Sequence, residues 1–187
     1  MWKVIPIVAV GVIVLFAIVV ALQPSAFRIT RQAKINAPAD TVFAQVNDFH
    51  KWRGWSPWER KDPALKRTYE GPPAGAGAIY SWVGNKEVGE GRMTLTDSRP
   101  SDLVRIKLEF FKPFAATNTA EFTFKPQGEQ TVVTWTMTGK NNFLCRAFCM
   151  FMDMDKMIGG DFEKGLIAMK TVAETSAART MITAAAH

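Results

Sequence analysis

The chain has 187 residues, enough for one ordinary domain and one additional segment. Apolar residues make up 48% and charged residues 21%, a globular balance that excludes a largely disordered chain. The formal net charge is +6. The two cysteines, Cys145 and Cys149, stand four positions apart in a predicted helix without a nearby histidine. That spacing disfavours a disulfide bond and a metal site, so we expect neither.

The first segment, Val4 to Leu22, is nineteen residues long and contains no charge. As a helix it would measure roughly 28 Å, close to the roughly 30 Å of a bilayer core. A cleaved signal peptide is the alternative because Lys3 gives a charged start, but secretory apolar regions are usually about 7–15 residues long. We therefore expect residues 1–27 to form a transmembrane anchor with a short linker. The expected location is the membrane, in either orientation, and the lipid bilayer is an expected partner.

The next elements alternate between strand and helix patterns. Residues 28–36 read as a strand, and residues 41–48 read as a helix with Asp40 as the N-cap. The stretch that begins at His50 is rich in tryptophan and proline and cannot continue this helix past Pro57.

From Lys66 onward the apolar residues recur every second position, which is typical of strands with one buried face. In the last of these strands Val133, Trp135 and Met137 point one way, while Thr134 and Thr136 point the other. The predicted strands cover residues 66–70, 76–83, 86–97, 103–113, 118–125 and 130–139.

Residues 142–175 have apolar positions spaced by three and four, which predicts one long helix with a bend at Gly159-Gly160. The expected domain covers residues 28–178, and residues 179–187 form an alanine-rich tail that we expect to be disordered. The predicted class is therefore α+β: about seven antiparallel strands curved around a long C-terminal helix, plus the N-terminal transmembrane helix. The apolar helix positions are Leu144, Phe148, Phe151, Met154, Ile158, Phe162, Leu166, Met169 and Ala173.

Several stretches resemble the SRPBCC superfamily of START-like and birch-pollen-allergen-like helix-grip proteins, and within it the membrane-anchored members labelled polyketide cyclase/dehydrase. They are INAPADTVFAQVNDFHKWRGWSPW, YEGPPAGAGAIYSWVGN, VGEGRMTL, TVVTWTMTG and MDKMIGGDFEKGLIAMK, and the resemblance covers about residues 28–175. It implies a helix-grip fold with a cavity for an apolar ligand. It does not select a reaction, because this scaffold serves lipid carriers, hormone receptors, cyclases and chaperone activators.

Large, adaptable side chains occupy the sheet face and the helix face that should meet. Methionine and aromatic residues suit an apolar ligand pocket, although an ordinary filled core could use the same residues. The expected ligand-binding residues are Tyr80, Trp82, Met93, Leu95, Phe110, Phe122, Trp135, Met137, Phe151 and Met154.

The stretch from His50 to Arg67 concentrates most of the positive charge, with six basic residues against two acidic ones and three tryptophans. Tryptophan with lysine and arginine next to an anchor favours contact with lipid headgroups. The alternative is that the tryptophans close the end of the core and the charges stay solvated; binding to nucleic acid is not expected. The residues expected at the membrane surface are Lys51, Trp52, Arg53, Trp55, Trp58, Lys61 and Arg67.

No catalytic group is predicted, and no cofactor. The two histidines are His50 and His187, and the acidic pairs of the long helix stand two positions apart, so their members face different directions. The expected function is a membrane-tethered module that binds a hydrophobic small molecule or lipid. The alternatives are a cyclase- or dehydratase-type enzyme that uses the same cavity, and a partner-binding protein with a filled core.

Overall fold

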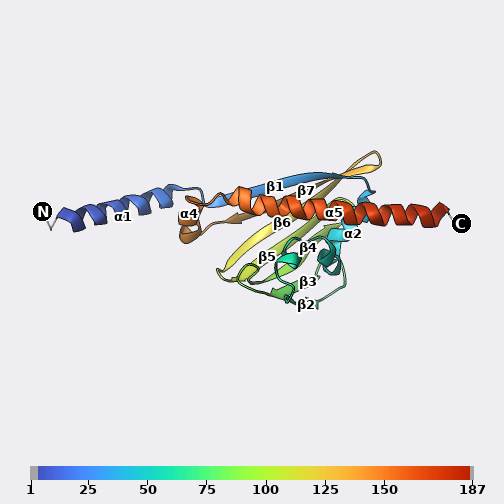
Figure 1. Ribbon diagram of the computed structural model, residues 1–187, viewed down its shortest axis with the longest axis horizontal. Helices are drawn as coiled ribbons and strands as arrows, with labels where there is room; N and C mark the ends of the chain where they lie inside the picture. The colour runs from blue at the N-terminus through green and yellow to red at the C-terminus, as the bar shows by residue number, and fades with distance from the viewer. Residues whose placement is uncertain (1–3, 186–187) are drawn as a thin grey trace.

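The computed structural model describes the backbone of residues 4–185 and the side chains of residues 8–183 (Figure 1). Lys3 and His187, which entered the signal-peptide and catalysis arguments, lie outside these residues. The elements are α1 (Val4–Leu22), β1 (Ala26–Ile35), α2 (Ala39–Asn47), the 3₁₀ helix η1 (Phe49–Gly54), α3 (Trp58–Lys61), β2 (Lys66–Glu70), β3 (Ile79–Val83), β4 (Glu90–Arg99), β5 (Leu103–Lys112), β6 (Ala116–Gln127), β7 (Gln130–Lys140), α4 (Phe143–Cys149) and α5 (Met154–Ala185).

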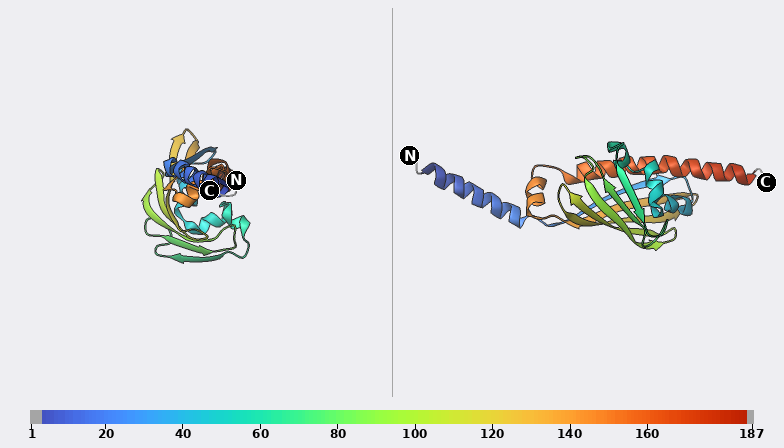
Figure 2. Two further views of the ribbon diagram at one scale, coloured as in Figure 1. Left: turned by 90° about the vertical axis from the view of Figure 1, so that its left-hand side faces the viewer. Right: turned by 90° about the horizontal axis from the view of Figure 1, so that it is seen from below.

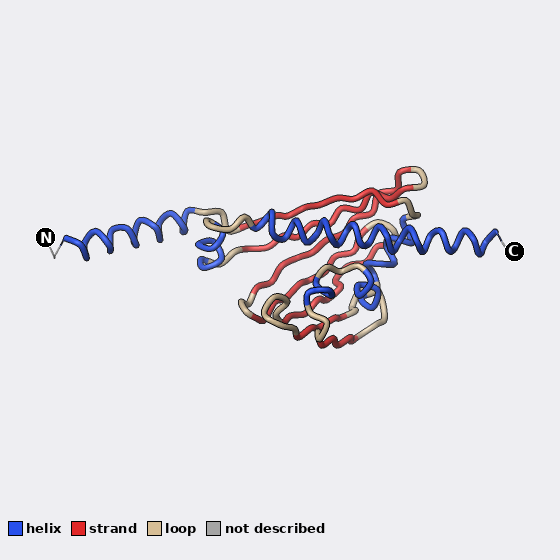
Figure 3. The backbone as a smooth tube through the Cα atoms, viewed as in Figure 1, coloured by secondary structure: helices blue, strands red, loops and turns tan. Residues whose placement is uncertain are grey.

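One antiparallel sheet contains all seven strands, in the order β1-β7-β6-β5-β4-β3-β2. Figure 3 shows α5 crossing the sheet, with strands visible above and below the helix, and the end-on view in Figure 2 shows the sheet curling around that helix. The alternating strands leave one apolar face, which the single long helix covers. The predicted α+β helix-grip architecture is confirmed.

The predicted strand register is also confirmed. Trp135 lies directly opposite Phe122 in the β6–β7 pair, and their side chains are 2% and 0% exposed on the inner face. Thr136 points to the outer face as expected, yet it is buried, because Thr30 of the neighbouring strand covers it and their hydroxyl oxygens lie 3.1 Å apart.

The predicted single long helix is two helices in the structure. Residues 150–153 interrupt it, and the Asp153 side chain accepts a hydrogen bond from the Lys156 backbone N–H at 3.0 Å at the start of α5. Gly159 does not end the helix: an added Cβ would collide with the guanidinium of Arg31, so this glycine makes room for the arginine. The apolar stripe is correct for α5, where Phe162, Leu166, Met169 and Ala173 are buried, and wrong for α4, whose Leu144 and Phe148 are half exposed.

Two helix ends also differ from expectation. Helix α2 begins at Ala39 after Pro38, and Asp40 lies inside its first turn. Helix α5 continues through Ala185, past the expected end of the domain. Residues 179–185 contain neither glycine nor proline, and the Thr180 and Thr183 hydroxyls donate to backbone carbonyls four residues earlier, so the helix is not interrupted.

The N-terminal segment forms the helix α1 over the predicted nineteen residues. Among the residues that the structure describes, however, no helix combines the length and the apolar character needed to cross a membrane.

Candidate functional site: a cavity between the sheet and the long helix

A cavity of about 460 Å³ lies between the inner face of the sheet and the first half of α5. Strands β3 to β7 supply its floor, α5 supplies its roof, and the segment from η1 to α3 forms one wall. The lining residues are Trp52, Ser56, Trp58, Glu59, Lys61, Leu65, Tyr80, Trp82, Glu87, Val88, Met93, Leu108, Phe110, Pro113, Ala120, Trp135, Met137, Met154, Met157, Ile158, Asp161 and Phe162.

Small residues and strand irregularities help to keep this space open. Ala120 contributes only a methyl group to the floor, beside Met137 on the next strand. Strand β4 shifts register at Glu90/Gly91, and a Cβ at Gly91 would collide with the Trp82 ring. The glycine therefore lets the indole of Trp82 lie against the strand, and such irregularities bend a sheet.

Most of the predicted ligand-binding residues line the cavity, and three do not. Leu95 and Phe122 are completely buried in the core. Phe151 was predicted to face the sheet, but it is 78% exposed and stacks on Phe16 of α1 with ring centroids 6.3 Å apart, because the interruption before α5 turns it outward. The predicted residues that line the cavity are Tyr80, Trp82, Met93, Phe110, Trp135, Met137 and Met154, and their contact with a ligand stays a prediction.

The tryptophan-rich stretch forms a wall of the cavity. Trp52 and Trp55 are 4% and 1% exposed, and their indole N–H groups donate to the carbonyls of Val46 and Gln45, each at 3.0 Å. Headgroup contact is therefore wrong for these two rings, which close the core as the alternative stated. Lipid contact by the exposed Lys51 and Arg53 stays a prediction.

The remaining two basic residues of the predicted membrane surface are engaged with acids. Arg67 donates to Glu59 through Nε at 2.8 Å and also through Nη2, and Lys61 pairs with Asp161. Trp58 is half-buried and packs edge-on against Trp135, with ring centroids 5.8 Å apart. These side chains are therefore directed to the cavity wall.

A polar network around Glu59 lies in that wall. The Tyr80 hydroxyl donates to Glu59 Oε1 at 2.9 Å, and the Glu59 side chain is 8% exposed. Burial, followed by the nearby Glu59 carboxylate, raises the pKa of Tyr80 well above its usual range. The hydrogen bond that Arg67 donates to Glu59 raises the pKa of the Arg67 guanidinium. Tyr80 thus stays protonated at neutral pH, where it can donate a hydrogen bond but cannot serve as a base.

One ion pair joins the wall to the roof. Lys61 Nζ lies 2.5 Å from Asp161 Oδ2, and the Asp161 side chain is 14% exposed. The sequence analysis considered Asp161 only as a member of one of the acidic pairs of the long helix, Asp161 and Glu163, and missed this role. The signal was present: Asp161 follows Ile158 by three positions, so a charged residue stands within the apolar stripe of the helix.

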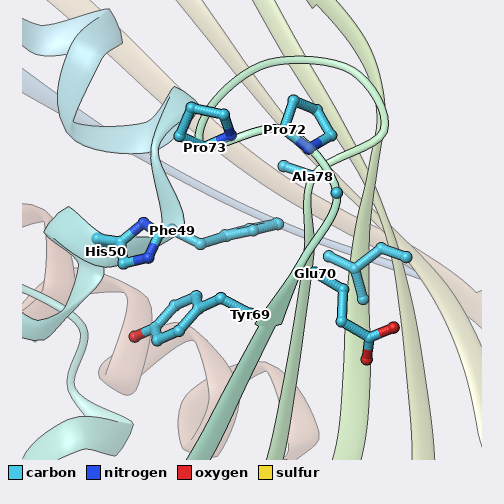
Figure 4. A pocket seen from close by; sticks show the side chains of 9 residues that line it. Phe49, His50, Tyr69, Glu70, Pro72, Pro73 and Ala78 are labelled. Carbon is cyan, nitrogen blue, oxygen red and sulfur yellow. The ribbon is translucent and has the colours of Figure 1, made fainter.

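A second, smaller pocket of about 240 Å³ lies outside the cavity, next to η1 (Figure 4). The rings of His50 and Tyr69 stack there with centroids 4.0 Å apart, and Pro72 and Pro73 lie on the loop above them. The carboxylate of Glu70 points away from the stacked rings.

Comparison with solved structures agrees with this architecture. A protein from Chromobacterium violaceum, CV1439, has a TM-score of 0.57 at 12% identity, covering 81% of this chain and 99% of that one. SA2116 from Staphylococcus aureus, a protein of unknown function, scores 0.61 at 11% identity, covering 83% and 98%. The di-domain ARO/CYC protein StfQ of the steffimycin biosynthetic pathway scores 0.59 at 12% identity, covering 82% and 52%. At sequence identities this low, the similarity shows that the fold is shared and does not show a shared function.

The sequence itself gives the family. None of the curated proteins compared with the chain matches it. Residues 26–174, most of the chain and all of the strands, match the family described as polyketide cyclase / dehydrase and lipid transport. With its seven-stranded sheet curved around a long C-terminal helix, the chain therefore belongs to this family of helix-grip proteins.

Proposed function

We propose that this protein binds a hydrophobic small molecule or lipid in the cavity beneath α5. The observation that carries the proposal is the cavity itself: about 460 Å³ within the range of ligand pockets, with an apolar floor and a few polar groups in one wall. The family description, which includes lipid transport, also supports it. The cavity argues against the alternative of a protein with a filled core.

A cyclase- or dehydratase-type enzyme is the second candidate. The family description and the ARO/CYC name of StfQ favour it, together with the placement of Glu59 in the wall and Tyr80 in the floor of the cavity. Binding and catalysis are separable: Glu59→Gln should retain an apolar ligand in either case. Loss of turnover of a linear polyketone in this variant, with binding retained, would establish the enzyme.

The binding proposal is tested by filling the cavity. Ala120→Phe places a ring into the floor, whereas Thr123→Phe places the same ring on the outer face of the same strand. We expect native mass spectrometry and lipid extraction of the purified full chain to show a stoichiometric apolar compound. That compound should be lost in Ala120→Phe and retained in Thr123→Phe. An empty wild-type protein that also fails to take up added apolar probes contradicts the proposal.

We also propose that α1 and α4 together attach the protein to a lipid surface. Arg146 Nη1 donates to the carbonyls of Ala21 and Gln23 at 3.0 and 3.2 Å, so α4 is held at the end of α1. The described side chains of α1 are apolar and mostly exposed, and Phe143 and Phe148 continue this exposed apolar surface. Burial of exposed apolar surface is favourable, and a lipid layer can bury this surface.

Membrane attachment is tested by flotation with lipid vesicles. We expect the full chain to float with the vesicles in a density gradient, and deletion of residues 1–27 to leave the domain unbound. A full chain that does not float, or a mature protein that begins near Leu22, contradicts the attachment.

A further inference from the structure

Exposed apolar side chains gather at one end of the sheet. Outside α1, most of the described large apolar side chains that are exposed belong to the end of β3, the turn between β5 and β6, and α4 with the connection into the first turn of α5. Three others, Ile167, Met181 and Ile182, lie further along α5. A concentration of this kind indicates an interaction surface. Its members are Val83, Phe111, Phe114, Phe143, Leu144, Phe148, Met150, Phe151, Met152 and Met157.

Strand pairing brings these segments together although they are distant in the sequence. Ala26, at the start of β1, pairs with Lys140 at the end of β7, and Gly139 pairs with Asn118 near the start of β6. The turn between β5 and β6 precedes Asn118, so it lies at the end of the sheet from which α1 and α4 extend (Figure 1). We call this the α1 end of the sheet.

The cavity opens at the α1 end. Most of its lining residues are buried or half-buried, and the exposed ones are Glu87, Pro113 and Met157. Glu87 belongs to the loop between β3 and β4, Pro113 to the turn between β5 and β6, and Met157 to the first turn of α5. These three segments therefore frame the mouth of the cavity. Phe114, which follows Pro113 directly, has a side chain that is 53% exposed, so the rim of the mouth is largely apolar.

Helix α1 ends close to this mouth. Three residues separate Leu22, the last residue of α1, from Ala26, the first residue of β1, so their Cα atoms are at most about 14 Å apart. Phe151, in the connection between α4 and α5, stacks on Phe16 of α1 with ring centroids 6.3 Å apart. The apolar surface of α1 therefore continues through α4 to the rim of the mouth, and a layer that buries α1 also meets the mouth.

Lipid suits this surface better than a protein partner does. The favourable burial of an apolar ligand is lost when the ligand passes through water. A mouth in contact with lipid lets the ligand move from one apolar surrounding to another. A protein that covered the rim would instead close the only exposed part of the described lining.

We infer that the rim of the cavity mouth inserts into the lipid layer that holds α1, and that the ligand is a molecule dissolved in that layer, which enters the cavity without crossing water. The inference rests on the proposed ligand binding and lipid attachment, and it adds the source of the ligand and its route.

Hydrogen–deuterium exchange of the full chain tests the contact. With phosphatidylcholine vesicles present, the backbone amides of residues 111–117 and 148–153 should exchange more slowly than without them. The turns at the opposite end of the sheet, residues 99–103 and 127–130, are the internal control and should not change. A rim that stays unprotected in protein that floats with the vesicles overturns the inference. Protection that appears without vesicles as the protein concentration rises also overturns it, because the rim would then join two copies of the chain.

Uptake of pyrene from the vesicles tests the route. Energy transfer from the tryptophans follows pyrene in the cavity, and Ala120→Phe, which fills the cavity, gives the background from pyrene in the lipid. Removing two phenylalanines from lipid should make uptake in Phe111→Glu/Phe114→Glu about tenfold slower. The final occupancy should not change, because neither phenylalanine lines the cavity.

The matched control is Ile167→Glu/Ile182→Glu. It adds the same two charges at exposed apolar positions of α5 outside the rim, so it should take up pyrene at the wild-type rate. Equal rates in the wild type and in Phe111→Glu/Phe114→Glu overturn the route while ligand binding stands. If that variant does not fold, the exchange pattern of the wild-type chain decides. A wild-type chain that takes up no pyrene counts against the proposed binding, and one that does not float counts against the attachment; the inference falls with either.

Discussion

Lys61 and Asp161 stand 100 positions apart in the chain, and their Nζ and Oδ2 atoms lie 2.5 Å apart in the structure. The lysine ends α3 in the cavity wall, and the aspartate belongs to the apolar stripe of α5 in the cavity roof. The pair therefore fastens two elements that together enclose the space, although one partner comes from the segment that the sequence associated with a membrane surface.

Breaking this ion pair should weaken the closure of the cavity. Exposed ion pairs contribute about 0.2–1 kcal/mol to stability, whereas removal of one partner of a buried pair costs about 3–5 kcal/mol. The Lys61–Asp161 pair is partly buried, so Lys61→Met should lower the free energy of unfolding by about 1–2 kcal/mol. Urea denaturation measures the loss. Ligand release should also become faster. Lys164→Met is the control, because Lys164 lies 3.8 Å from the same aspartate and its side chain is 75% exposed. Equal losses in the two variants would contradict a specific role for Lys61.

Tyrosine ionisation should report on the integrity of the wall. Tyr69 and Tyr80 are the only two tyrosines in the sequence, and burial, with the nearby Glu59 charge as a lesser cause, raises the pKa of both. Above about pH 10 the unfolded chain loses these protons and the folded chain keeps them, so stability should fall as the pH rises. Below that pH the two groups contribute no slope.

Ultraviolet absorbance of tyrosinate checks this prediction. In the native protein the signal should stay low past the normal tyrosine pKa and then rise together with unfolding followed by circular dichroism. Tyr80→Phe should make the alkaline loss of stability less steep. A native protein in which both tyrosines ionise near their normal pKa, without unfolding, would contradict the burial of these hydroxyls.

The strands were predictable because the alternation of apolar and polar residues that defines a strand lies within a few consecutive positions of the sequence. Alternation in residues 130–139 placed Trp135 inward and Thr134 outward, and that register fixes the floor of the cavity. The same reasoning failed at Phe151, since apolar spacing alone cannot distinguish a continuous helix from two helices with a break between them. The exposed Phe148 shows that an apolar stripe also serves surfaces outside the core.

The polar wall could not be predicted from the sequence, because its partners are distant in the chain. Glu59 meets Tyr80, 21 positions away, and Asp161 meets Lys61 only after α5 has folded across the sheet. The basic composition of residues 50–67 suggested a charged surface, but several of these charges are paired within the fold. Composition counts charges and tryptophans without showing which of them the fold pairs or buries, and for that reason the membrane-surface assignment failed for Trp52 and Trp55.

Truncation should distinguish rings that border the cavity from rings enclosed in the core. Phe122 is fully buried and does not line the cavity, so Phe122→Ala should cost about 4–5 kcal/mol. Trp135→Ala removes a larger ring, which stacks on Phe122 and Phe162, but should cost only about 3 kcal/mol, because the part of the ring that lines the cavity has fewer contacts to lose. Chemical denaturation of both variants measures the difference. A distinctly larger loss for Trp135→Ala would mean that its environment is as filled as that of Phe122.

Two glycines of α5 should respond to alanine with opposite signs. Alanine is favoured over glycine within a helix by about 1 kcal/mol, so Gly160→Ala should stabilise the protein by up to that amount, since nothing lies within 4 Å of the added methyl group. At Gly165 the added methyl group would lie 2.9 Å from Trp135 Cζ3 and 3.1 Å from Pro57 Cδ. Relief of this crowding requires the helix to move away from the sheet, and overpacking of this kind costs about 1–3 kcal/mol, more than the helix gains. Thermal unfolding of the two variants under the same conditions gives the sign of each stability change.

The stacking of Trp135 on Phe162 should also weaken in Gly165→Ala. This weakening should be visible as a change in near-ultraviolet circular dichroism that Gly160→Ala does not show. Stabilisation by both substitutions would mean that α5 does not press on Trp135 at Gly165.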